Sequence, residues 1–336
     1  MASPDVESRF ATLFEGQPAI LAPMEDVTDA LYRQLCRDEG AHLCVTEFVN
    51  VEGLLRGCRK AKRKITLEAH DHPTAIQIYG SNPDRLAEAA ELAEAAEPAF
   101  IDINCGCWVP KIARRGAGAG WLRDPDAMVA MAKMVVERVK IPVTVKTRIG
   151  IGGEQEMPIV DIARRMEDVG VRVMTLHCRT AKMGHDGQAD WTWARRVREA
   201  TTIPVIVNGD IKCALSAKRA LDETGCAGVM VGRRAIEHPW VFREIRAYLD
   251  RGELVDPPSL SERLAMARRL LTESVALRGE PRGIYSSRRH LAGYIRGLRR
   301  AAVLRRALFS ADTLAENLDL LDRFEADQDA TEGEAA

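Results

Sequence analysis

The chain has 336 residues, of which 46% are hydrophobic and 29% are charged, and its formal net charge is −1. This composition is typical of a globular protein, and no apolar run approaches the ~20 residues that cross a bilayer. The N-terminus lacks a basic segment followed by an apolar one and the eight cysteines are scattered, so we expect a reduced, cytoplasmic protein.

Short runs of apolar and β-branched residues recur along the chain, separated by stretches rich in Ala, Leu, Glu and Arg. We predict eight strands, at residues 19–22, 43–47, 74–78, 99–103, 142–146, 173–177, 204–208 and 228–232. Alternation of apolar strands with helices, such as 84–96 and 126–139, predicts an α/β fold in which a parallel sheet closes into a TIM (β/α)₈ barrel. An open, doubly wound sheet is the alternative, but it would favour a glycine-rich fingerprint after the first strand, where Ala22-Pro23-Met24-Glu25 stands.

After a barrel at residues 1–249, the C-terminal quarter of the sequence is predicted to form three further parts. Residues 250–259 (DRGELVDPPS) have the composition of a linker, and 260–323 show helical periodicity without strand signals, which predicts a small all-helical domain. The acidic segment 324–336 is expected to be disordered. Residues 259–309 contain twelve arginines against three acidic residues, which alone is compatible with either a solvated basic face or a nucleic-acid surface.

Polar residues and glycines stand at the C-terminal ends of the predicted strands, where barrels of this class build their sites. The candidate cofactor-binding residues are Pro23, Met24, Gln77, Lys146, His177, Asn208, Gly209, Asp210, Gly232 and Arg233. Glycines after the last two strands, with Arg233, suit a phosphate, because backbone N–H groups can approach it closely. Gln77 could hydrogen-bond the pyrimidine edge of a flavin, and Lys146 would stabilise the negative charge of its reduced ring.

Stretches of the chain, in order and spacing, resemble the tRNA-dihydrouridine synthase family from about Ile20 to Ile245. They include LAPMEDVTDALYR, AIQIYGSNPDRLAEAA, FIDINCGCWVPKIARRGAGAGWLRDP, VTVKTRIG, LHCRTAKMGHDGQADW and GVMVGRRAIEHPWVFREI. The later RRHLAGYIRGLRRAAVLRRAL resembles the helical RNA-binding domain of that family.

The resemblance implies FMN as cofactor, NADPH or NADH as reductant, and reduction of the uracil C5=C6 bond in tRNA by a monomeric, metal-free enzyme. Hydride would pass from the flavin to C6, and a cysteine would protonate C5. The expectation of no metal rests on spacing: Cys105 and Cys107 could form only a weak metal site, because no second cysteine or histidine pair stands at a suitable distance along the chain. The family motif N-x-G-C falls on Asn104 to Cys107, which makes Cys107 the proton donor and leaves Cys105 to packing. Asn104 and Arg179 are assigned to the substrate, and His177 with Arg179 matches the family's H-x-R. The arginines expected to line the RNA backbone are Arg288, Arg289, Arg296 and Arg299.

One departure from the family stands beside the proposed proton donor. The family usually has proline directly after this cysteine, whereas here Trp108 takes the place and Pro110 follows two residues later. Trp108 either stacks on a base or fills the site, so the target nucleotide stays open. Two alternatives also remain: a flavin barrel that reduces a free pyrimidine or another small enone, and a non-catalytic flavoprotein that binds RNA.

Overall fold

Eight parallel strands close into a barrel in the first of two units of this chain. The computed structural model describes residues 3–152 and 157–333. The first unit comprises Met1–Gly232 and Val241–Leu254, and the second comprises Arg233–Trp240 and Val255–Ala336. In these described ranges, no helix is both long and apolar enough to span a membrane.

Strand pairing runs around the barrel without an open edge, because β1 pairs with β2 on one side and with β9 on the other. The strands are β1 (Ala19–Leu21), β2 (Leu43–Val45), β4 (Thr74–Tyr79), β5 (Ile101–Cys105), β6 (Val143–Arg148), β7 (Val173–His177), β8 (Val205–Asn208) and β9 (Gly228–Val231). A two-residue strand, β3 (Val49–Asn50), pairs only with the end of β4. Each of the eight predicted ranges overlaps one of the eight barrel strands, so the predicted TIM barrel is confirmed.

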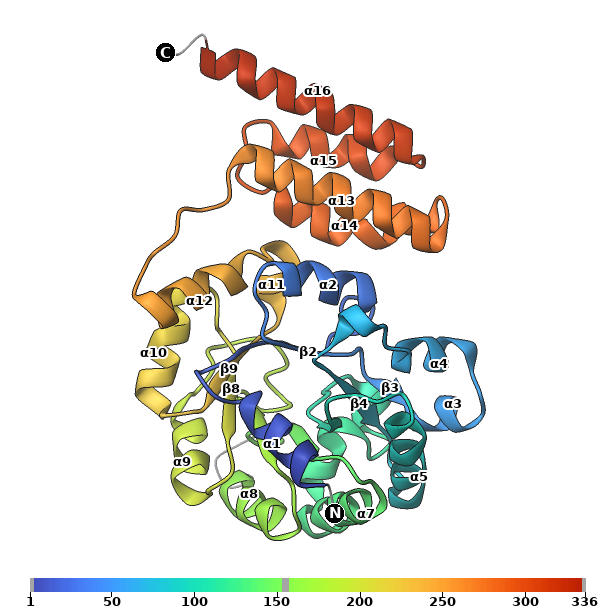
Figure 1. The fold of residues 1–336 in the computed structure, drawn as a ribbon, viewed down its shortest axis with the longest axis vertical. Helices are drawn as coiled ribbons and strands as arrows, with labels where there is room; N and C mark the ends of the chain where they lie inside the picture. Colours follow the sequence, from blue (N-terminus) through green and yellow to red (C-terminus); the bar gives the residue numbers. More distant parts are fainter. Residues whose placement is uncertain (1–2, 153–156, 334–336) are drawn as a thin grey trace. The chain divides into compact units, whose positions relative to one another are not determined.

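Helices surround the strands, as Figure 1 shows for α5, α7, α8, α9 and α10. The α-helices of this unit are α1 (Pro4–Thr12), α2 (Ala30–Asp38), α3 (Val51–Leu55), α4 (Arg59–Ile65), α5 (Pro83–Glu94), α6 (Pro110–Ala113), α7 (Pro125–Arg138), α8 (Ile159–Asp168), α9 (Thr192–Ala200), α10 (Ala214–Thr224) and α12 (Val241–Arg251). Two 3₁₀ helices, η1 (Ala69–Asp71) and η2 (Gly118–Arg123), complete it. Local sequence sets several helix starts: Asn82 and Asp124 each accept a backbone N–H of the first turn, immediately before a proline.

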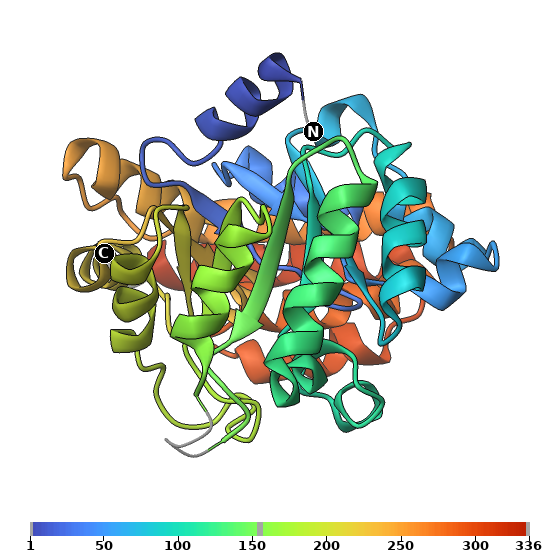
Figure 2. The same ribbon diagram turned by 90° about the horizontal axis from the view of Figure 1, so that it is seen from below.

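The short helix α1 closes the end of the barrel at which the strands begin. Phe10 and Phe14 lie in one buried cluster with residues from the starts of several strands, and the Phe10 ring meets the Phe100 ring edge-on at 5.4 Å. Figure 2 shows α1 in dark blue at this end of the strands. Because α1 covers this end, the polar residues lie at the opposite, C-terminal end of the strands.

The second unit is helical, and its elements are α11 (Arg233–Glu237), α13 (Leu260–Arg278), α14 (Arg282–Tyr294), α15 (Ala301–Ser310) and α16 (Leu314–Gly333). The helical periodicity predicted within 260–323 is interrupted where the chain turns between α14 and α15. Gly297 and Arg300 both adopt positive φ in this turn, 79° and 60°. Within this unit α11 packs against α14, and the Glu237 backbone leaves no room for a Cβ at Gly293.

The acidic segment predicted to be disordered is instead helical as far as Gly333, the last residue described. Leu321 and Phe324 of α16 are buried, and Arg268 of α13 binds Asp322 and Glu325 at 2.7 and 2.6 Å. The burial of Phe324 and the ion pair of Glu325 therefore fix the first residues of the acidic segment within the helical unit, while residues 334–336 lie outside the described range. The unit boundary at Leu254–Val255 lies inside the predicted linker, but Arg233–Trp240 group with the helical unit rather than with the barrel.

Candidate active site at the mouth of the barrel

Strand register places most of the predicted cofactor residues side by side at the C-terminal end of the barrel. Asn104 of β5 pairs with Lys146 of β6, and His177 of β7 pairs with Asn208 of β8. Gln77 of β4 pairs with the residue two before Asn104 in β5. Because side chains two apart in a strand share a face, these groups face one space.

A buried chain of amide and carboxylate groups fixes Gln77. Its Nε2 donates to Asp102 Oδ2 at 2.6 Å, and its Oε1 accepts from Asn104 Nδ2 at 2.7 Å. Thr144 donates to the other Asp102 oxygen at 2.5 Å. Burial raises the pKa of Asp102, although the bonds from Gln77 and Thr144 oppose this shift. Asp102 was not among the predicted site residues; its place two residues before Asn104, on the same strand face, was the available signal.

Asn104 links this chain to the loop that carries Cys107. Its Oδ1 accepts the backbone N–H groups of Gly106, at 3.1 Å, and Cys107, at 2.9 Å. Burial raises the pKa of the half-buried Cys107 thiol above its ordinary value, against smaller opposing effects of the Val109 amide and Arg148. Cys105, by contrast, is fully buried, as expected for a packing residue.

Arg148 at the end of β6 holds the same loop from its other side. The side chain is 2% exposed, and its Nε donates to the Gly106 carbonyl at 2.9 Å. Its Nη1 donates to the carbonyls of Thr180, at 2.9 Å, and Gly184, at 2.8 Å, in the loop after β7. The guanidinium thus ties the Cys107 loop to its neighbour, a role that no local sequence pattern indicated.

Lys146 and His177 give the mouth a cation beside a neutral imidazole. Lys146 Nζ donates to Asn208 Oδ1 at 3.1 Å. Burial, together with the positive charge of Arg148, lowers the pKa of Lys146 to about 8. Burial and the charges of Lys146 and Arg148 lower the pKa of His177 far below its usual value, so this ring is neutral at physiological pH.

Two glycines directly follow β8 and β9 and differ in their surroundings. Gly209 has φ of 114°, and a Cβ there would lie 3.1 Å from the His177 ring and 2.9 Å from Ala189 Cβ. A Cβ on Gly232 would lie 3.9 Å from Met24 Sδ, in ordinary contact, so Gly232 borders the loop of Pro23 and Met24. Gly232 therefore suits the close approach of a phosphate or ring to the backbone, whereas the Cβ side of the buried Gly209 is filled by His177 and Ala189.

Arg179 was predicted to bind the substrate, but its side chain is buried and bonded within the protein. Its side chain is 2% exposed, and Nη2 binds both oxygens of Asp210, at 2.7 and 2.8 Å, and the Gly187 carbonyl at 2.7 Å. Burial alone would raise the pKa of Asp210, but the bonds from Arg179 and the Ala189 amide hold it below its usual value. Arg179 therefore positions Asp210 and the loop after β7 from within the protein.

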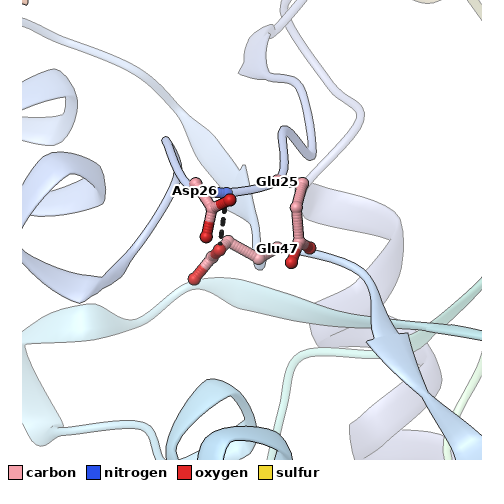
Figure 3. Close-up of side chains that lie close together, drawn as sticks. All are labelled: Glu25, Asp26 and Glu47. Carbon is pink, nitrogen blue, oxygen red and sulfur yellow. Dashed lines mark hydrogen bonds between the residues drawn. The ribbon is translucent and has the colours of Figure 1, made fainter. Parts of the chain in front are cut away.

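Three carboxylates near the mouth, Glu25, Asp26 and Glu47, have oxygens within 4.8 Å of one another (Figure 3). Glu47 accepts the Asp26 backbone N–H at 2.7 Å, the bond dashed in Figure 3. Lys64 lies 2.5 Å from Glu25 and 3.4 Å from Glu47, and Lys60 lies 3.3 Å from both Glu25 and Asp26. The lysines neutralise the cluster, which anchors the loop that follows Met24.

The four arginines predicted to bind RNA differ in their surroundings within the helical unit. Arg288 stacks on Tyr285, with 4.2 Å from Cζ to the ring centroid, and contacts Asp312 at 3.3 Å. Arg296 forms a two-bond pair with Glu237 at 2.5 and 2.9 Å. Arg289 and Arg299 are exposed.

The chain is similar to known proteins along most of its length. The family model described as dihydrouridine synthase (Dus) matches residues 20–331. A probable tRNA-dihydrouridine synthase 1 of Synechocystis sp. is 38% identical over 303 residues, 90% of this chain and 84% of that protein. The tRNA-dihydrouridine synthase B of Escherichia coli is 34% identical over 309 residues, 91% of this chain and 95% of that protein.

Among solved structures, a complex of 2-naphthoyl-CoA reductase with 2-naphthoyl-CoA superposes with a TM-score of 0.53 at 11% identity. It covers 68% of this chain and 49% of that one, and it shows a shared fold. The family match, which spans most of the sequence, carries the assignment: this chain belongs to the dihydrouridine synthase family.

Proposed function

We propose that this chain reduces the C5=C6 bond of uridine in tRNA to dihydrouridine, with FMN bound at the mouth of the barrel. Family membership supports the reaction. The observation that supports the site is the meeting, at one end of the barrel, of a protonated thiol with a lysine, a neutral histidine and the glycines that directly follow β8 and β9.

The residues present fit a flavin nucleotide. Gly209, Gly232 and Arg233 would receive its phosphate, with Arg233 directly following Gly232 in the chain. Gln77 and Lys146 would face the polar edge of the ring, and the remaining contacts would come from the other predicted residues, Pro23, Met24, His177, Asn208 and Asp210. When bound, FMN supplies hydride-transfer chemistry, renewed by NADPH or NADH.

Gln77 and Lys146 act through orientation and charge. Asp102 and Asn104 leave Gln77 one side-chain N–H for a ligand, because its oxygen and its other N–H are engaged. The lysine ammonium favours negative charge on a neighbouring ring. Because burial lowers the pKa of Lys146, an anion bound beside it would raise that pKa again and stabilise the protonated form of Nζ.

Cys107 holds the proton that the reaction needs at C5. Burial keeps the thiol protonated near neutral pH, which a general acid requires. Asn104 accepts the Cys107 backbone N–H, and Arg148 donates to the Gly106 carbonyl, so both side chains hold this loop. The thiol would therefore meet the base in a defined position. We propose that the enzyme is monomeric and acts in the cytoplasm. The exposed arginines of the helical unit would contact the RNA.

The direct test combines flavin content with product analysis. Purified protein should show flavin absorbance bands and, with NADPH, should form dihydrouridine in an unmodified tRNA transcript, measured by mass spectrometry. Free uridine and uracil should react far more slowly, because they lack the phosphate contacts that position the base. Rapid reduction of free uracil with an unreacted transcript would instead support the small-molecule reductase.

A further inference from the structure

A pocket of about 490 Å³ opens beside the loop that carries Cys107. Three segments line it, each following a barrel strand at its C-terminal end: Trp108, Arg114 and Arg123 after β5, Ile151 and Gly152 after β6, and Lys182 after β7. The pocket is therefore at the mouth of the barrel, and none of the cofactor residues above lines it. Its volume is typical of a small-ligand site.

The charge of this pocket favours an anion. Arg114, Arg123 and Lys182 are cationic, and no carboxylate stands among the described residues that line the cavity. Arg123 also donates to the Ala113 carbonyl at 2.8 Å. Arg114 and Lys182 are exposed, and among residues 3–152 and 157–333 neither forms an ion pair with an acidic group. Cations that no carboxylate of the described residues neutralises attract phosphodiesters.

Trp108 supplies an aromatic wall that is already held in place. Its side chain is 37% exposed, although it lies one residue from Cys107. A Cβ built on Gly184 would lie 3.4 Å from the indole ring, and the His185 ring meets the indole edge-on at 5.7 Å. The loop after β7 therefore supports the indole, while the ring still lines the pocket.

We propose that this pocket binds the nucleotide next to the reduced uridine, with its base against Trp108 and its phosphate at Arg114 and Lys182. The inference rests on the proposed function, which places the target uridine at Cys107. When a uridine is drawn out of the stack, the adjoining base loses its stacking partner on that side. An indole ring that stacks on this base compensates for the loss. Since Trp108 follows Cys107 directly, the two subsites are as close as adjacent nucleotides require.

The aromatic part is tested by steady-state kinetics on a tRNA transcript with W108A and W108F. Loss of stacking should raise the KM for tRNA about tenfold in W108A, with a much smaller change in kcat. W108F should stay within about threefold of the wild-type KM, because a phenyl ring still stacks. Flavin absorbance of each preparation establishes that the cofactor site is loaded.

The charged part is tested by salt titration of tRNA binding to an R114A/K182A double variant. The slope of log affinity against log salt should become shallower by roughly two, one for each lost phosphate contact. K140A is the control, because Lys140 is exposed and lies three residues before the start of β6, at the opposite end of the barrel. K140A should keep the wild-type slope.

The outcomes separate this inference from the proposed function. Wild-type KM in W108A, a fall in kcat alone, or an unchanged salt slope in the double variant would overturn the subsite while the reaction itself stands. Failure of the wild-type protein to form dihydrouridine in tRNA would overturn the proposed function itself. Restoration of KM by W108F, together with a shallower slope in R114A/K182A alone, supports the subsite.

Discussion

Cys107 and Cys105 stand two residues apart, yet only one of them can serve a substrate. Cys105 lies wholly buried in β5, whereas Cys107 is half-buried on a loop shaped by Asn104. At this scale, function depends on access and on the protonation state that burial imposes. Lys146 illustrates the same point, because burial brings its pKa to about 8.

Replacement of Cys107 by alanine should remove the proton donor and leave the cofactor site intact. We expect uridine reduction to fall about 10²- to 10⁴-fold, the usual contribution of a general acid, with flavin absorbance unchanged. Cys105→Ala is the control, and it should keep activity with a small loss of stability. A fully active C107A beside an inactive C105A would show that the motif register is wrong.

The affinity for FMN should depend on pH through Lys146. Below its pKa of about 8 the side chain is already cationic, so affinity is constant. Above that pH a proton must be taken up on binding, and affinity should fall by up to about tenfold per pH unit. Fluorescence titrations of FMN between about pH 7 and pH 9 measure this, with Lys146→Arg as the control because arginine stays charged. The same decline in the arginine variant would assign the effect to another group.

At the scale of elements, the loops after β5 and β7 are held together by a residue of the strand between them. Arg148 of β6 donates to Gly106 in one loop and to Thr180 and Gly184 in the other. Arg179 does the equivalent for the loop after β7 and Asp210. Side chains of two strands thereby help to fix the conformation of the loops, together with the backbone hydrogen bonds within and between these loops.

Arg148→Met should lower both stability and turnover. Three carbonyls lose a charged, buried donor, so we expect a loss of about 2–4 kcal/mol in the free energy of unfolding. Turnover should fall about tenfold or more because the Cys107 loop loses one of its anchors. Arg148→Lys keeps the charge and should recover part of both.

The control for this prediction is Arg138→Met. Arg138 is exposed, at the end of α7, and pairs with Glu91 at 2.6 Å, so its removal should cost less than about 1 kcal/mol. Thermal unfolding of flavin-loaded proteins and steady-state kinetics measure both effects. Equal behaviour of the Arg148 and Arg138 variants would remove the positioning role.

At the scale of the whole molecule, charge is divided between segments that partly neutralise each other. The basic stretch 259–309 meets the acidic helix α16, and pairs such as Arg268 with Glu325 join them. A count of arginines therefore overstates the charge available to RNA. Arg289 and Arg299 are exposed, whereas Arg288 packs on Tyr285.

Adjacent residues provide the matched test of RNA binding. Arg289→Ala with Arg299→Ala should weaken tRNA binding and reduce its salt slope by roughly two, while NADPH oxidation without RNA stays nearly intact. Arg288→Ala should instead destabilise the helical unit by about 1–2 kcal/mol through lost stacking and hydrogen bonds. Salt titrations and circular dichroism separate the two effects. Normal binding by the folded double variant would show that the RNA is held elsewhere.

The sequence by itself determined the eight strands, their order and the polar residues at their ends. These follow from local pattern, because apolar runs, helix caps and motif spacing are properties of neighbouring residues. Lys146 and His177 could be singled out for the same reason, since strand ends in a barrel converge wherever the strands themselves lie. Cys107 was identified by its place in the family motif N-x-G-C.

Only the tertiary structure decided which of those residues face one another and which are engaged within the protein. The burial of Arg179 against Asp210, the three carbonyls of Arg148 and the ordering of α16 all join residues far apart in the chain. No local pattern encodes such pairings, because their free energy comes from removing both partners from water together. The pocket beside Trp108 arises in the same way, from three loops that meet only after the barrel has closed.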